Sequence, residues 1–187
     1  MPDDREEIIR KMARACKPIA VLEDLPDAAE QEKYVLSVAR SIFEDQGELP
    51  RSVVFRATFP VTKLLAMETR ITEELAPHAG EMLRALAKGF QATQLYQLTE
   101  MWMATTDKPD EGPPPSQRPD RKEAIMVICE DPTRGPPLRT HYALITRDEQ
   151  GKGTLGDWQL FTHGEGRLTY LLPPEAYQAV GREMPKA

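Results

Sequence analysis

Alternation of hydrophobic and polar positions predicts β-strands through the second half of the chain. Residues 124–129 are an unbroken apolar run, AIMVIC, which is typical of a strand buried on both faces of its sheet. Residues 93–104 alternate well enough to form the strand before it, although their apolar spacing would also suit a helix. Their Thr, Tyr and Trp residues favour the strand. We expect these two runs to be neighbours, joined by the proline-rich loop 107–122.

Further strand-like segments lie on both sides of this pair. In the first of them, Val53, Phe55 and Ala57 alternate with more polar positions, as in a half-buried strand. The pattern of residues 61–70 suits either a strand or a short helix. The remaining strand-like segments, with the first, are residues 51–59, 138–147, 154–162 and 164–172.

Helical periodicity and end signals predict helices in four places, at about residues 3–15, 27–46, 72–90 and 174–184. In the second, Asp27 can cap the start, and Gly47 followed by Pro50 marks the end. Its apolar residues fall on one side, and its charged residues, Glu32 among them, fall mostly on the other. This helix should therefore pack one face on a core and turn the other to solvent.

These elements predict an α+β fold: an antiparallel sheet of four to five strands, covered on one face by helices and preceded by an N-terminal helical pair. At 187 residues the chain fits one compact unit. Within it we distinguish an N-terminal helical segment, residues 1–48, from an α+β domain, residues 49–187. The helical pair could be docked on the domain or form a detachable arm.

Charge and composition narrow the classes of function. The net charge is −6, and residues 1–50, with seven Lys/Arg and twelve Asp/Glu, have a net charge of −5. Because nucleic-acid affinity depends on basic surfaces, a nucleic-acid partner is not expected. No apolar run approaches the ~20 residues that cross a bilayer, and the acidic start is unlike a signal peptide. We expect a soluble, cytoplasmic protein. The absence of Asn and the excess of Arg over Lys are typical of a G+C-rich bacterial gene.

No motif in the sequence supports a bound cofactor or a disulfide. Cys16 and Cys129 are distant and lie in different kinds of element, so we expect two free thiols. Gly151, Gly153 and Gly156 spell the G-x-G-x-x-G of dinucleotide-binding proteins. That motif needs a helix start after the glycines, whereas the strand-like DWQLF follows here. A hairpin turn without a cofactor is the better interpretation.

Metal-dependent chemistry has equally little support. Pro119 and Asp120 match the start of a PD…(D/E)xK nuclease motif, but no Asp/Glu-x-Lys triplet follows on a strand. His78, His141 and His163 are far apart in the chain and form no HxH or HExxH pair. We expect no metal site.

Glu100 is the most unusual residue in the apolar runs. A buried carboxylate must be paired or protonated, because leaving it charged and unpaired costs several kcal/mol. We expect Glu100 to pair with Arg118 or Arg121 and so to fix the long loop. The alternative is a functional site, since carboxylates with shifted pKa values gather at such sites. Its candidate catalytic residues are Glu100, Asp120, Arg121 and His141.

The same segment resembles a family of uncharacterised bacterial proteins. The shared pattern is an E-x-W strand, here EMWM at residues 100–103, followed by P-S-x-x-P-D-R-x-E-A, here PSQRPDRKEA at 115–124. The resemblance covers about residues 50–150 and implies the strand–loop–strand arrangement, with no assigned activity. This chain has Met101 where the family has Ala and Arg118 where it has His. No role that depends on a histidine in this loop carries over.

Two functions of different class follow. The first is a non-enzymatic accessory or regulatory protein that binds a protein partner, or itself, through its acidic N-terminal helices or its proline-rich loop. The second is a small metal-dependent or carboxylate-using hydrolase with a site near Glu100 and the 107–122 loop. The absence of a catalytic motif in the sequence favours the first.

Overall fold

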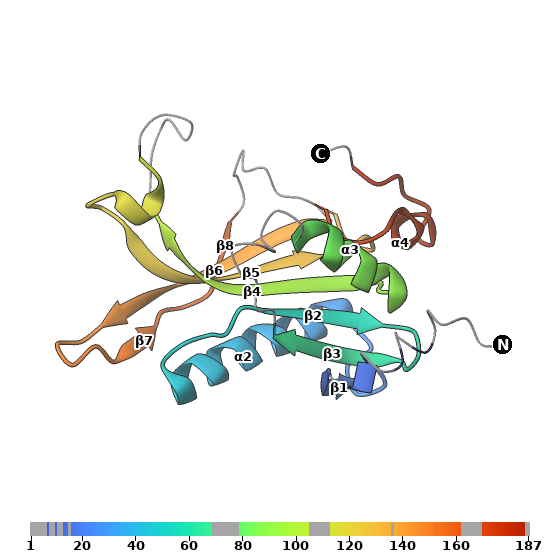
Figure 1. Ribbon diagram of the computed structural model, residues 1–187, viewed down its shortest axis with the longest axis horizontal. Helices are drawn as coiled ribbons and strands as arrows, with labels where there is room; N and C mark the ends of the chain where they lie inside the picture. The colour runs from blue at the N-terminus through green and yellow to red at the C-terminus, as the bar shows by residue number, and fades with distance from the viewer. Residues whose placement is uncertain are drawn as a thin grey trace.

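In the part of the chain that the structure describes, eight antiparallel strands in one sheet, curled into a half-barrel, form the centre of the molecule (Figure 1). The computed structural model describes residues 16–68, 79–104, 113–135, 137–161 and 170–185, together with residues 7, 10, 13 and 14. The strand order is β1-β3-β2-β4-β5-β6, and β7 and β8 both pair with β6. The strands are β1 (Lys17–Val21), β2 (Ser52–Ala57), β3 (Lys63–Glu68), β4 (Gln94–Met103), β5 (Lys122–Glu130), β6 (Leu138–Arg147), β7 (Gly153–Leu155) and β8 (Gln159–Phe161).

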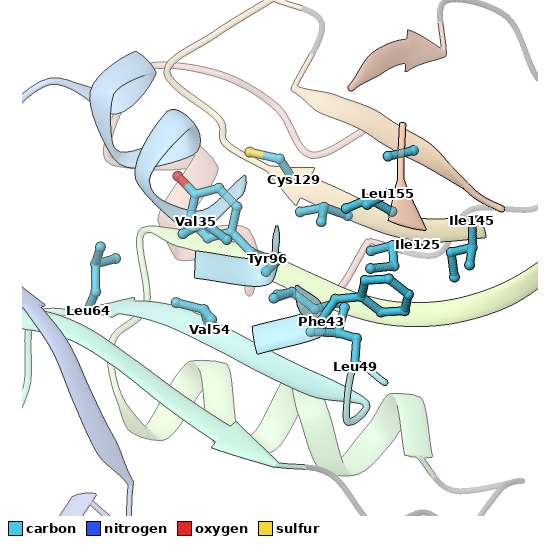
Figure 2. Packing of buried hydrophobic residues seen from close by; sticks show 14 of the residues in the cluster. Val35, Phe43, Leu49, Val54, Leu64, Tyr96, Ile125, Cys129, Ile145 and Leu155 are labelled. Carbon is cyan, nitrogen blue, oxygen red and sulfur yellow. The ribbon is translucent and has the colours of Figure 1, made fainter. Parts of the chain in front are cut away.

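Helices cover both faces of this sheet, so the prediction of one covered face is wrong. The long helix α2 (Ala28–Gln46) packs on one face, and α3 (Ala79–Gly89) and α4 (Pro174–Gln178) pack on the other (Figure 1). Strand alternation divides the core between them: Tyr96 and Leu98 of β4 face α2, and Leu95 faces the other helices. Figure 2 shows the core on the α2 side.

The bounds of α2 confirm the sequence prediction of a helix at 27–46. Asp27 Oδ1 accepts hydrogen bonds from the N–H groups of Ala29 (2.6 Å) and Glu30 (3.2 Å), which would otherwise lack partners. At the other end Gly47 adopts a positive φ of 75°, and its N–H donates to Phe43 O at 2.7 Å. The local chemistry of the chain therefore sets both ends of this helix.

The predicted N-terminal helical pair is wrong. The residues 17–21 shortly before α2 form β1, which pairs with β3. Of the predicted helix 3–15 the structure describes residues 7, 10, 13 and 14, which are helical, and the rest lies outside the described residues. The side chains of Val35 and Phe43 on α2 are fully buried, so this helix is part of the core. Sequence patterns miss β1 because it is short and contains Pro18, and because its pairing partner lies more than forty residues away.

The predicted number of strands, four to five, is also too low. Residues 63–68 of the ambiguous segment form β3, and residues 94–103 form β4, as the strand interpretation predicted. The predicted strand 154–162 is divided into β7 and β8. The predicted strand 164–172 lies largely outside the described residues.

Between β7 and β8 the chain has one residue more than β6 has opposite it. Leu155 is opposite Ile145, and Gln159 is opposite Tyr142, so three residues on this side lie opposite two on β6. The N–H of Gly156 still donates to Leu144 O at 2.9 Å. This is the two-against-one geometry of a β-bulge, which bends a strand without ending its sheet.

The other two predicted helices, at residues 72–90 and 174–184, agree with the structure only in part. Of residues 72–90, the structure describes α3 from Ala79 onward. The last helix, predicted to reach about residue 184, ends at Gln178. Gly181 has a φ of 70°, and the N–H of Arg182 donates to Tyr177 O at 3.0 Å, which is how a glycine after a helix closes its last turn.

The G-x-G-x-x-G segment forms the β6–β7 hairpin and the bulge after it. Gly151 has a positive φ of 80° in the turn. Gly153 lies against Phe43, where a Cβ atom would come within 2.6 Å of the ring carbon Cζ. A Cβ on Gly156 would find its nearest atom, Leu144 O, at an ordinary 3.5 Å. Gly151 and Gly153 are thus explained by backbone conformation and close packing. Strands, and not the helix that a dinucleotide-binding motif needs, follow the glycines.

We therefore expect Gly153→Ala to lower the free energy of unfolding by about 1–3 kcal/mol, because the added methyl group overlaps the buried Phe43 ring. Gly156→Ala is the matched control and should cost much less. Urea denaturation of both variants measures the difference. Equal losses in the two variants would show that the approach of Gly153 to Phe43 does not determine stability.

Candidate functional site

The structure does not bring the four candidate residues into one site. Glu100 lies on β4 facing α2, is half-buried, and its Oε1 accepts a hydrogen bond from Leu49 N at 2.5 Å. Asp120 is exposed before β5. His141 lies on β6 and also faces α2, but it is two strands away from Glu100 and one pair of residues further along. Strand spacing and rise put their Cα atoms about 12 Å apart, with Ile125 and Val127 between them.

Glu100 does not pair with Arg118 or Arg121 as predicted. Arg118 instead donates to both carboxylate oxygens of Asp120, at 3.0 and 2.9 Å. The Arg121 guanidinium lies over the Trp102 ring, 4.6 Å from its centroid, and donates to the Ser116 carbonyl. Both arginines therefore hold the described end of the loop.

The principal polar cluster is one that the sequence pattern missed. Glu32 on α2 is 7 % exposed and receives three basic side chains. Its Oε2 accepts from Arg134 Nη1 at 3.0 Å and from Arg139 Nε at 3.1 Å, with a further bond from Arg139 Nη2. Its Oε1 lies 2.7 Å from His141 Nε2. We call Glu32, Arg134, Arg139 and His141 the Glu32 cluster.

Three elements far apart in the sequence position this cluster. Arg139 and His141 are two residues apart on β6, so both side chains leave the same face of the sheet. Arg134 lies in the connection from β5 to β6, and Glu32 lies in the second turn of α2. The cluster therefore joins the first half of α2 to one end of the β5–β6 pair.

The neighbouring side chains keep the Glu32 carboxylate ionised. Burial raises the pKa of Glu32, but the hydrogen bonds and charges of His141 and Arg139 outweigh it and bring the pKa down to about 2, from an ordinary 4.5. Since an ionised carboxylate can only accept hydrogen bonds, the contact with His141 requires the hydrogen on Nε2. Burial lowers the pKa of Arg139, but the bond to Glu32 and nearby negative groups raise it overall. The ionised Glu32 carboxylate therefore forms ion pairs with Arg134 and Arg139 and a hydrogen bond with His141.

Cys129 stands next to the cluster and completes a set of Cys, His and Glu side chains that superficially resembles a nucleophilic triad. Arg139 Nη2 donates to Cys129 Sγ at 3.3 Å. The thiol is 0 % exposed, and burial raises the pKa of Cys129 far above its usual range. A cysteine nucleophile must be a thiolate that substrate can reach. This arrangement therefore has a structural role.

The end of β5 carries two more buried carboxylates. Glu130 faces the α4 side and accepts hydrogen bonds from Leu171 N, Leu172 N and the Tyr177 hydroxyl, at 2.7 to 3.1 Å. Glu130 thereby holds the described C-terminal segment on the sheet. Asp131 accepts from Gln94 Nε2 at 2.7 Å and from the backbone N and hydroxyl of Thr133 at 2.9 and 2.7 Å. Buried carboxylates are stable when they are bonded in this way.

Sequence reasoning placed Glu32 on the solvent side of its helix, and that prediction is wrong. A usable signal exists: Glu32 is four residues before Leu36 and seven before Ala39, which puts it on the flank of the buried stripe. Arg139 and His141 likewise share the strand face of Ala143, which is 0 % exposed. Opposite charges on two apolar faces would have indicated a buried ion pair.

Comparisons with protein-family models, curated proteins and solved structures find no match to this chain. The resemblance to the uncharacterised bacterial family stays a prediction. In the described part of the chain no group of three His, Cys, Asp or Glu side chains is arranged to hold a metal ion. None of the helices described is long and apolar enough to cross a membrane.

We expect Glu32→Gln to destabilise the fold at neutral pH and to flatten its acid sensitivity. The folded pKa of Glu32, about 2, lies below the ordinary 4.5, so its ionisation stabilises the fold above pH 4.5. This contribution, about 3 kcal/mol, is lost as the pH falls from 4.5 towards 2. The stability difference between wild type and variant, measured by urea denaturation, should shrink over that range.

Glu30→Gln is the matched control, because Glu30 is an exposed carboxylate in the first turn of α2, two residues before Glu32. It should leave both the stability and its pH dependence nearly unchanged. If Glu32→Gln behaved like this control, the Glu32 cluster would contribute nothing to stability.

Proposed function

We propose that this protein is a non-enzymatic accessory or regulatory protein that binds a protein partner at its β8 edge. The observation that carries this proposal is the exposure of two large apolar side chains side by side on that strand. Leu160 is 49 % exposed and Phe161 is 44 % exposed. Because successive residues of a strand point to opposite faces, the pair offers an apolar contact on each side of the edge.

The backbone of β8 adds to this recognition surface. Among the described residues β8 pairs with β6 alone, so in this part of the chain the N–H and C=O groups on the other side of the strand have no strand partner. A partner segment that added itself here would form backbone hydrogen bonds and place alternate side chains next to Leu160 and Phe161. The chemistry favours an extended, uncharged and partly apolar segment.

The opposite edge of the sheet supports the proposal by contrast. β1 begins with Lys17 and Pro18, the two residue types that most often prevent an edge strand from pairing with another chain. β8 contains Gln, Leu and Phe and has neither a lysine nor a proline. One edge of the sheet is thus protected and the other is suited to association.

The hydrolase near Glu100 and the 107–122 loop has less support. Glu100 binds the backbone of Leu49, Asp120 is paired with Arg118, and His141 is paired with Glu32. Each candidate group is therefore engaged in its own local structure. The distance between Glu100 and His141 across the packed core also separates them from a common substrate.

The test is to purify the tagged chain from the cells that encode it, as wild type, Phe161→Lys and Val21→Lys. Val21 is the control, because it is 45 % exposed but lies on the guarded β1 edge. We expect a partner in fixed ratio, either another protein or a second copy, with the wild type and Val21→Lys. Phe161→Lys should lose it, because a lysine on an edge strand opposes strand addition.

Equal urea denaturation midpoints for the two variants would show that folding is not the cause of any loss. Recovery of the partner with Phe161→Lys would contradict the β8 edge as the binding surface. Recovery of the wild type alone, as a monomer, would contradict the proposed function itself.

A further inference from the structure

Three strands, β1, β7 and β8, are the outer strands of the sheet in the described part of the chain, and two of them are blocked. β1 contains Lys17 and Pro18, and its pairing with β3 is irregular next to Pro18. Lysine, proline and bulges all oppose the pairing of an edge strand with another chain. At β7 the Arg40 guanidinium donates to Leu155 O at 3.1 Å and to Gly156 O at 2.5 Å. The residues of β8 include neither a lysine nor a proline.

Only one edge-to-edge pairing of two copies of this chain avoids the blocked strands. Any pairing through β1 or β7 would involve Lys17, Pro18 or the carbonyl groups that Arg40 occupies. A β1–β8 pairing would also be head-to-tail, and such contacts add copies without end unless their rotation closes a ring. An antiparallel β8–β8 pairing joins the same surface of both copies. A two-fold axis generates this pairing, so it closes at two copies.

The residues of β8 have the properties expected of a segment that adds to the β8 edge. Such a segment should be extended, uncharged and partly apolar, and β8 is a strand with the sequence Gln-Leu-Phe. With the two-fold axis at the central Leu160, this side chain meets its own copy on the α2 side of the sheet. On the other face Gln159 meets Phe161 of the second copy. The strand is therefore complementary to itself.

Tyr142 on β6 holds the two side chains that would meet on that other face. Its hydroxyl donates to Gln159 Oε1, and its ring makes an edge contact with the Phe161 ring, with centroids 6.3 Å apart. Side chains that are already held in one position lose less conformational entropy when a partner binds. The β8 edge is thus organised for association before a partner arrives.

Charge does not oppose this pairing at short range. The chain has a net charge of −6, so two copies repel each other at a distance. Asp157 precedes Leu160 by three residues, so the two copies of Asp157 would lie about 20 Å apart along the paired strands, well beyond the ~8 Å screening length of physiological salt. His141, opposite Leu160 on β6, is bonded to Glu32 and would lie three strand spacings, about 14 Å, from its copy.

We propose that the partner at the β8 edge is a second copy of this chain, paired antiparallel about a two-fold axis near Leu160, so that two half-barrels share one sheet. This inference rests on the proposed function, because it names the partner of the same edge. Since β8 has three residues, the contact is small and the dimer should depend on concentration. Since the contact is uncharged, added salt should leave the dimer unchanged or strengthen it.

The first test is sedimentation equilibrium of the purified chain as wild type, Phe161→Lys and Val21→Lys. Between about 1 and about 500 µM, the range in which weak dimers form, wild type and Val21→Lys should pass from monomer to dimer. Phe161→Lys should raise the dissociation constant at least about tenfold, because each copy places its lysine in the uncharged contact. Val21 is the control because it is 45 % exposed on the blocked β1 edge.

The second test is oxidation of Leu160→Cys, which does not depend on the folding of Phe161→Lys. A residue at the axis faces its own copy with a Cα–Cα distance of about 4.5–5.5 Å, and this suits a disulfide. Leu160→Cys should therefore form a covalent dimer faster than Val21→Cys. The native Cys16 and Cys129 are 6 % and 0 % exposed, so they should not compete.

Three outcomes would overturn the inference. They are a monomer at every concentration, a dimer that Phe161→Lys leaves unchanged, and equal rates of cross-linking for the two cysteine variants. If the purified chain is a monomer but another protein binds the tagged chain through Phe161, the proposed function stands and the second copy is the wrong partner. If no partner is recovered either, both proposals fail.

Discussion

The burial of the Glu32 carboxylate is the constraint on which the packing of α2 depends. An isolated charge in this interface would cost several kcal/mol, so the helix is stable on the sheet only where Glu32 meets its basic partners. The apolar stripe of α2 alone would tolerate small shifts along the sheet, since hydrophobic contact has no preferred direction. The bonds to Arg139 and His141, made by both oxygens, have a direction and so fix the position of α2 relative to β6.

The same physical logic operates on the opposite face of the sheet. Cys129 and Glu130 are adjacent on β5 and therefore point to opposite faces, the first towards the Glu32 cluster and the second towards the C-terminal segment. Each face has an apolar core with a polar anchor at this end of the strand. Elements are thus anchored on both faces of the sheet near the point where β5 leads into β6, and this explains why so apolar a strand ends in Glu130.

The sequence predicted what local chemistry determines. The ends of α2 followed from Asp27 and Gly47, and β4 followed from its alternating pattern. It failed where partners distant in the chain decide: β1 exists because β3 pairs with it, and Glu32 is buried because β6 supplies Arg139 and His141 as its partners. The partner of Glu100 was missed for a related reason, since a backbone N–H such as that of Leu49 leaves no mark in a pattern of side chains.

The distribution of charge bears on the binding role that we propose. The described carboxylates that are most deeply buried, Glu130 and Asp131, bind groups of the chain itself, and Glu32 is engaged in the same way. Groups held so firmly cannot also move protons or bind a substrate without loosening the fold. The proposed binding role uses the surface instead, where the two edges of the sheet differ in their protection. Because unprotected strand edges carry a risk of aggregation, the proposed partner would also cover the exposed Leu160 and Phe161.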